Sequence, residues 1–230
     1  MMLKREEFAK KERFTFEDLV DLMTILRSDT GCPWDREQTH ESIRTNLIEE
    51  TYEAVEGIDK NDAAIMREEF GDVLLQVVFH AEIAKESGEF DMDDVITDVC
   101  KKLVERHPHI FADVKADTAD KVLDNWNQIK AATKHQKTLY DKLESISKAL
   151  PSLMRAKKMA SKIRKDGAVY QSEDLQTLSA QLSSAETREE KEETLGRMLF
   201  ALSVYSDQND IDAEAALYNA CEATLESYKE

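Results

Sequence analysis

Hydrophobic residues in the first half of the chain recur every three or four positions, which is the repeat of an amphipathic helix. The pattern predicts helices over residues 16–27, 39–58, 63–86 and 91–106, with another beginning near Asn125. The core positions expected on the third helix are Ile65, Phe70, Val73, Leu74, Val77 and Val78. Runs of β-branched residues are short, so the pattern favours an all-α fold.

Polar residues and breakers at the ends of these stretches indicate where the helices start and stop. Thr39 is expected to cap the second helix and Asp91 the fourth. Residues 57–62 (GIDKND) indicate a short turn, which makes the second and third helices antiparallel neighbours. Pro108 disfavours helix in the residue before it, so the fourth helix is expected to end there.

Two stretches of the first half recur in the second half. Residues 68–81 (EEFGDVLLQVVFHA) align with residues 193–206 (ETLGRMLFALSVYS), and residues 90–106 align with residues 211–227. The chain is therefore expected to contain two tandem copies of one helical module. The expected domains are a catalytic module over residues 1–130, a polar connecting segment over residues 131–150, and a degenerate second module over residues 151–230.

Composition narrows the class of protein further. Of 230 residues only six are Gly and three are Pro, which agrees with helices joined by short loops. A net charge of −17 argues against nucleic-acid binding, which needs clustered Lys and Arg. Three cysteines without metal-ligand spacing indicate reduced thiols. The start MMLKREEFAK is no signal peptide and VLLQVVF is too short to span a membrane, so a cytoplasmic protein is expected.

The segment EETYE carries three glutamates, Glu49, Glu50 and Glu53. Residues three apart share a helix face, so Glu50 and Glu53 project together. Glu69 and Asp72 form a second pair of this kind on the next helix. Antiparallel packing would bring the two pairs into one cluster of four carboxylates. Their mutual repulsion is relieved by a hard divalent cation, and oxygen ligands of this kind favour Mg²⁺.

The EExxE spacing alone is weak evidence in a chain with 48 acidic residues. Glu189, Glu190 and Glu193 repeat it in the second copy, but the following positions there are Thr194 and Arg197. The second copy therefore lacks the second carboxylate pair. We expect a single catalytic module, the first, with the second copy structural or regulatory.

Basic and aromatic residues in the first copy are candidates for contacts with substrate. The fourth predicted helix carries three basic residues near its end, Lys101, Lys102 and Arg106. The last two share a face because they are four residues apart. They can neutralise phosphates, although surface ion pairs are an equally good interpretation. Trp34 lies in a loop predicted for residues 29–39 (DTGCPWDREQT), where it can stack on a base or cover a small core.

In this order the motifs resemble the MazG nucleoside triphosphate pyrophosphohydrolases. The matching segments are GCPWDREQTHESIR, LIEETYE, EEFGDVLLQVVFHA, RHPHIF and NWNQIK. The resemblance covers nearly the whole chain and matches the two-module bacterial form. It implies an all-α fold, dependence on Mg²⁺ with Mn²⁺ as a substitute, and hydrolysis of nucleoside or deoxynucleoside triphosphates to the monophosphate and pyrophosphate.

The resemblance also implies roles for individual residues. The metal ligands that it implies are Glu50, Glu53, Glu69 and Asp72. The positions that it assigns to phosphates or the base are Lys102, Arg106, Trp126 and Lys130. Glu49 remains as the carboxylate that holds or activates the attacking water. Independently of the resemblance, the apolar helix faces favour association into a homodimer.

Other classes of protein share some of these sequence features. A related all-α dUTP or dCTP pyrophosphatase, or a phosphoribosyl-ATP pyrophosphohydrolase, is disfavoured by the CPWD and RHPHIF segments. A non-catalytic scaffold or nucleotide-sensing protein stays open until pyrophosphate release is assayed. A ferritin-like di-iron bundle needs Glu-x-x-His pairs, and the carboxylate motifs contain no histidine.

Overall fold

The computed structural model describes residues 5–112, 114, 116–133, 138–170 and 173–229, and over these residues it contains helices and no strand. The all-α prediction is confirmed. The chain divides into two compact units, Met1–Trp126 and Asn127–Glu230. Within the described part, none of the helices is both long enough and apolar enough to cross a membrane.

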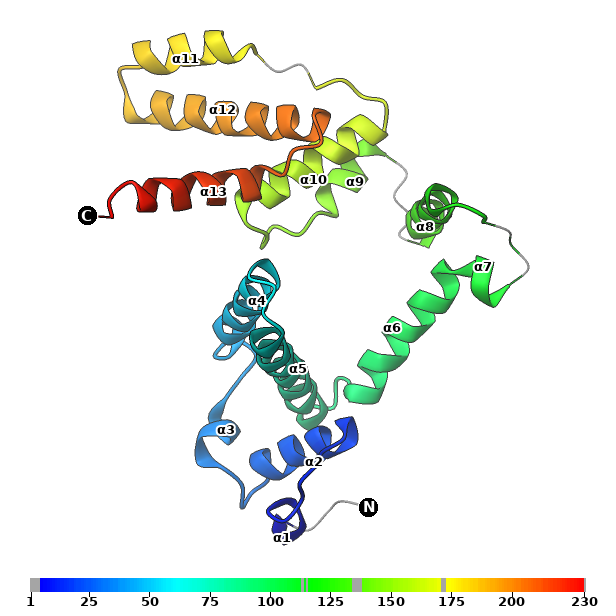
Figure 1. Ribbon diagram of the computed structural model, residues 1–230. Coiled ribbons are helices and arrows are strands. Elements are labelled where there is room, and N and C mark those ends of the chain that lie inside the picture. The colour runs from blue at the N-terminus through cyan, green and yellow to red at the C-terminus, as the bar shows by residue number, and fades with distance from the viewer. Residues whose placement is uncertain (1–4, 113, 115, 134–137, 171–172, 230) are drawn as a thin grey trace. The chain divides into compact units, whose positions relative to one another are not determined.

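The first unit is built around a long helical hairpin (Figure 1). Its helices are α1 (Arg5–Phe8), α2 (Phe16–Arg27), α3 (Pro33–Glu37), α4 (Arg44–Asp59), α5 (Ala63–Glu86), α6 (Met92–Arg106), α7 (Pro108–Phe111) and the start of α8 (Ala119–Thr133). The predicted bounds of α2 and α5 are confirmed. Asp91 caps α6 as predicted, because its carboxylate accepts the backbone N–H of Asp94 at 3.0 Å.

The predicted start of α4 is wrong. The helix begins at Arg44, and Ile43 before it provides no side-chain cap. Thr39 accepts a hydrogen bond from the backbone N–H of Ser42 at 3.3 Å, so it caps a separate turn that precedes the helix. A local side-chain bond therefore competes with helix extension at this point.

Two other segments also differ from the prediction. The loop expected after α2 contains the short helix α3, with Pro33 in its first turn, where a missing N–H costs nothing. Helix α8 begins at Ala119, six residues before the expected start at Asn125. Over the described residues of the segment 131–150, α8 continues to Thr133 and a further helix, α9 (Leu139–Glu144), follows.

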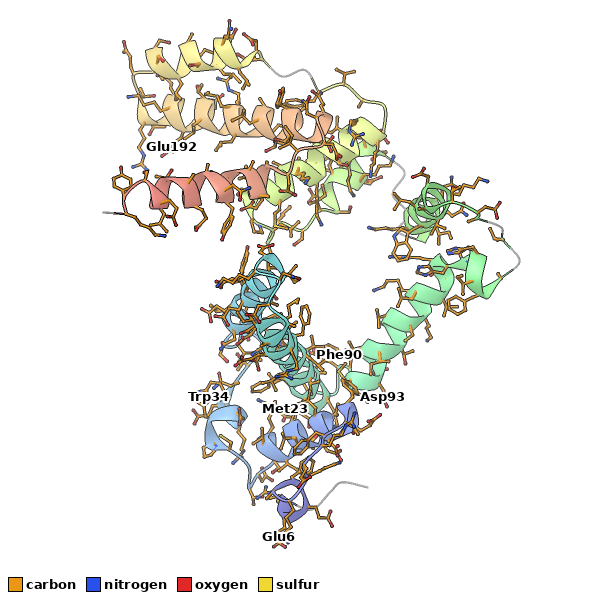
Figure 2. The ribbon with its side chains drawn as sticks, in the orientation of Figure 1. Glu6, Met23, Trp34, Phe90, Asp93 and Glu192 are labelled. Atoms are coloured by element: carbon orange, nitrogen blue, oxygen red, sulfur yellow. The ribbon has the colours of Figure 1, made fainter. Side chains whose placement is uncertain are left out.

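The core of the first unit lies where α2 packs against the second half of α5. Met23, Ile43, Val78 and Phe79 are buried there, and Figure 2 shows Met23 on α2. The expectation that the whole apolar stripe of α5 is core is wrong: Phe70 and Leu74, in its first half, are 51% and 38% exposed. The reason is that the core formed with α2 lies around Val78 and Phe79, beyond these two residues.

Helices α4 and α5 form the antiparallel hairpin that the turn at residues 57–62 predicted (Figure 1). Asp62 caps α5 through the backbone N–H of Ala64 at 2.9 Å. Gly57 is buried, and a Cβ atom there would lie 2.9 Å from Ile65 Cγ2 and 3.0 Å from the backbone nitrogen of Met66. Only a glycine allows the two helices to approach this closely.

The second unit repeats this pairing of helices. Its helices after α9 are α10 (Ser152–Lys165), α11 (Leu175–Ser184), α12 (Arg188–Gln208) and α13 (Ala213–Glu226). Helix α12 packs against α10 and α11 in the way that α5 packs against α2 and α4. A capping box between Thr187 and Glu190 fixes the start of α12.

Candidate metal centre

Three carboxylates meet where the middle of α4 faces α5. Glu50 of α4 and Glu69 and Asp72 of α5 each offer an oxygen atom, and these atoms lie within 4.8 Å of one another. Glu69 and Asp72 share a face because they are three residues apart on one helix. All three side chains are half-buried. The structure therefore brings together three of the four predicted metal ligands.

The other two glutamates of the motif lie at the edge of this group. Glu53 and Glu49 are exposed, and Glu53 is not part of the set of mutually close oxygens. Both nevertheless influence the cluster electrostatically: the charge of Glu53 raises the pKa of Glu69 and of Glu50, and the charge of Glu49 raises the pKa of Glu50.

The cluster is electrostatically unfavourable in the absence of a cation. Burial raises the pKa of Glu50 above its usual value, and the charges of Asp72, Glu53 and Glu49 raise it further. Burial likewise raises the pKa of Glu69, with contributions from Glu53 and other neighbouring carboxylates. The neighbouring charges that raise these two pKa values are carboxylates.

The donor set fits a hard divalent cation. It consists of carboxylate oxygens without sulfur or nitrogen donors, which is the ligand chemistry of Mg²⁺, Mn²⁺ and Ca²⁺. Glu50, Glu69 and Asp72 would hold the ion, and the exposed Glu53 acts on Glu50 and Glu69 through its charge. A bound cation would offset the repulsion that raises the two pKa values.

The raised pKa values predict how the metal-free protein responds to pH. Because Glu69 keeps its proton to higher pH in the folded chain than in the unfolded chain, where its pKa is near 4.5, its contribution to stability is present in acid and lost as the pH rises. Glu69→Gln should therefore raise the free energy of unfolding more at about pH 7.5 than at about pH 4.5. Urea unfolding of the metal-free proteins measures this, and an equal gain at both pH values would contradict it.

The second unit has a guanidinium group where the first has a carboxylate. Arg197 aligns with Asp72, and it pairs with Glu173 and donates from Nη2 to Gln181 Oε1 at 3.0 Å and to Thr194 Oγ1 at 3.3 Å. A fixed positive charge thus ties α12 to its neighbours. Over the described residues, no cluster of three metal-ligating side chains lies in this unit.

Two of the basic and aromatic candidates contact each other. The guanidinium of Arg106, at the end of α6, lies 5.1 Å from the centre of the Trp126 ring of α8, a cation–π contact. Lys130 follows Trp126 by four residues on α8 and so shares its face. Lys101 and Lys102 are exposed on α6. The structure brings Arg106 and Trp126 together and leaves the two lysines accessible.

One predicted residue lies apart and one important residue was missed. Trp34 is 58% exposed and projects from α3 (Figure 2), and it is not part of the buried cluster formed by α2 and α5. Gly57 was predicted only as part of a turn. Its missing side chain sets the spacing of the two helices that carry the carboxylates. The signal available in the sequence was a glycine one helical turn after Glu53, inside a continuous helical pattern.

Comparisons with known proteins agree with these features. The profile of the MazG nucleotide pyrophosphohydrolase domain matches residues 38–111, which include both carboxylate pairs. A nucleoside triphosphate pyrophosphohydrolase/pyrophosphatase MazG of Thermotoga maritima is 39% identical over 227 residues, which are 96% of this chain and 86% of that protein. A nucleoside triphosphate pyrophosphohydrolase of Escherichia coli K12 is 36% identical over 225 residues, 92% of this chain and 85% of that protein. The chain belongs to the MazG nucleotide pyrophosphohydrolase family.

Proposed function

We propose that the first unit hydrolyses nucleoside or deoxynucleoside triphosphates to the monophosphate and pyrophosphate. The observation that carries the proposal is the convergence of Glu50, Glu69 and Asp72 in a chain of this family. As a member of the family the chain is a hydrolase that acts on nucleoside triphosphates. Mg²⁺, with Mn²⁺ as a substitute, is the proposed cation, and Glu53 is its proposed fourth ligand.

The residues of the chain have distinct proposed roles in this reaction. A cation of this class neutralises phosphoryl oxygens and lowers the pKa of bound water. Glu49 is exposed beside Glu50, where it can orient the attacking water and accept its proton. Lys101, Lys102 and Arg106 would stabilise the charge of the leaving pyrophosphate.

The aromatic side chains are proposed to hold the base. Trp126 already carries the Arg106 guanidinium on its ring, so a nucleotide bound there would meet a positive charge and a flat apolar surface together. Lys130, one turn later, would add a second charge near the phosphates. Trp34 presents an accessible ring on α3.

A homodimer in the cytoplasm is the proposed form of the protein. Equivalent positions of the repeat are exposed and apolar in both units: Phe70 and Leu74 on α5, and Leu195 and Leu199 on α12. Apolar side chains at matching positions of two helices favour burial against a second copy. Sedimentation at several concentrations measures this association.

The test of the proposed function is pyrophosphate release from a panel of canonical and damaged nucleotides with Mg²⁺. Wild-type protein is expected to release pyrophosphate from at least one nucleotide. Glu53→Gln should abolish turnover while circular dichroism shows unchanged helix content. The matched control is Glu189→Gln, which removes a glutamate from the similar acidic segment of the second unit and should leave turnover unchanged. Full activity of Glu53→Gln would contradict its assignment as a ligand.

A further inference from the structure

Two histidines from distant parts of the chain share a hydrogen bond in the first unit. The Nδ1 atoms of His40 and His80 lie 2.8 Å apart, and their rings are parallel to within 6° with centres 5.0 Å apart. His40 lies in the turn before α4, and His80 lies on α5. One Nδ1 must carry a hydrogen and the other a lone pair, so the bond requires complementary tautomers or one shared extra proton.

This hydrogen bond lies at one end of the packing between the α4 segment and α5. At the turn end, Gly57 lies against Ile65, and in the middle Glu50 faces Glu69 and Asp72. At the open end, His40 meets His80. The metal-ligating carboxylates therefore lie between two fixed contacts, a close backbone approach and a histidine pair. A change at either end would alter the separation of Glu50 from the two acids on α5.

Buried residues and backbone hydrogen bonds lie next to the histidine pair. Ile43 and Phe79, which are 2% and 4% exposed, are part of the core next to it. From α2, Arg27 donates to the backbone oxygens of Asp35 and Gln38 and so holds the chain that leads to His40. The Nδ1–Nδ1 bond thus joins the turn before α4 to α5 beside these packed residues.

The charged groups near the pair are either paired with other residues or exposed to solvent. The guanidinium of Arg27 lies 5.4 Å from the centre of the Phe79 ring and is bound to Glu86 at 2.7 Å, so their charges offset one another. Glu41, beside His40, is exposed, and its pKa is lowered by a backbone hydrogen bond, by Thr39 and by the charge of His40. Glu82 lies two residues after His80 on α5, and its carboxylate is paired with Lys85 at 3.0 Å.

We propose that the His40–His80 hydrogen bond positions Glu50 against Glu69 and Asp72, and that its loss when both rings are protonated weakens the cation site in acid. The inference rests on the proposed function, because it concerns the same cation site. A neutral or singly protonated pair keeps an N–H donor facing a lone pair. A second proton leaves two N–H groups and two positive charges facing each other.

The direction of the pH effect follows from the burial of the pair. Burial lowers the pKa of His80, and the charge of His40 lowers it further. His80 therefore takes up its proton below the ordinary histidine value of about 6.5. The effect should therefore appear as the pH falls from about 7 toward about 5.

The test measures Mn²⁺ binding to the full chain by electron paramagnetic resonance. At about pH 7.5, His40→Ala and His80→Ala should each weaken Mn²⁺ binding about tenfold, the size typical of residues that orient metal ligands. The double variant should be no weaker than either single variant, because the two rings act as one unit. Helix content by circular dichroism should be unchanged in all three.

His80→Asn separates positioning from titration. An amide at this position can donate to or accept from His40 whatever its protonation, so Mn²⁺ affinity at about pH 7.5 should match wild type. Between about pH 7.5 and 5.5, wild-type affinity should fall several-fold more than that of His80→Asn, whose remaining fall comes from the carboxylates.

These measurements separate the role of the histidine pair from the function proposed for the cation site. Wild-type affinity in the alanine variants, additive losses in the double variant, or an identical pH response in His80→Asn would overturn the histidine inference alone. Glu50→Gln serves as the reference for the site and should bind no Mn²⁺ with comparable affinity. If wild-type protein itself binds no Mn²⁺, the proposed function fails and this inference fails with it.

Discussion

Asp72→Asn is expected to reduce pyrophosphate release about a thousandfold or more, which corresponds to about 4 kcal/mol of lost transition-state stabilisation. The metal-free variant should nevertheless unfold at a higher temperature than wild type. The charge of Asp72 raises the pKa of both Glu50 and Glu69, so removing that charge relieves repulsion in the folded chain. Steady-state kinetics and thermal unfolding in a chelator measure the two effects.

The control for this variant is Asp98→Asn, which removes one negative charge from an exposed position on α6. It should change neither the activity by more than about twofold nor the unfolding temperature by as much as Asp72→Asn, since isolated surface charges contribute little. An Asp72→Asn protein that is inactive and also less stable than wild type would show that Asp72 supports the fold rather than a cation site.

Gly57→Ala is expected to reduce both stability and activity. The added Cβ would lie 2.9 Å from Ile65 Cγ2 and 3.0 Å from the backbone nitrogen of Met66, so α4 must move away from α5. Overpacking costs about 1–3 kcal/mol, and the helix propensity of alanine returns about 1 kcal/mol, which leaves a net loss of about 1 kcal/mol. A displacement of about 1 Å at the carboxylates should cost about a hundredfold in turnover.

Gly71→Ala is the matched control, because Gly71 lies on α5 and a Cβ atom there would meet nothing within 4 Å. This variant should gain about 0.5–1 kcal/mol from helix propensity, the opposite sign to Gly57→Ala. Both tryptophans, Trp34 and Trp126, belong to the first unit, so their fluorescence in urea follows the unfolding of the unit that contains both glycines. Equal gains in the two variants would contradict the close approach at Gly57.

The helices that the sequence predicted best are those with long periodic patterns and strong caps. Helix α5 has 24 residues and begins after Asp62, whose side chain caps it, and its bounds were predicted correctly. The start of α4 was mispredicted because Thr39 caps a local turn instead. The exposure of Phe70 was not predictable, since periodicity shows which face is apolar but not how much of that face another helix covers.

The candidate site was partly predictable for a similar reason. Spacing on two antiparallel helices is enough to bring Glu50, Glu69 and Asp72 together, and the structure has them within 4.8 Å. The bond between His40 and His80 joins residues 40 positions apart and has no spacing rule that predicts it. Its existence depends on how the turn before α4 lies against α5, which helical periodicity does not predict.

The central claim is that the carboxylates of α4 and α5 hold a divalent cation on which nucleotide hydrolysis depends. The most direct test is to titrate metal-free wild-type and Asp72→Asn protein with Mn²⁺, recording the bound ion and pyrophosphate release in the same samples. Wild-type protein should bind Mn²⁺ and gain activity over the same concentration range, and Asp72→Asn should lose both. Pyrophosphate release by wild-type protein in excess chelator, or unchanged Mn²⁺ binding by Asp72→Asn, would contradict the claim.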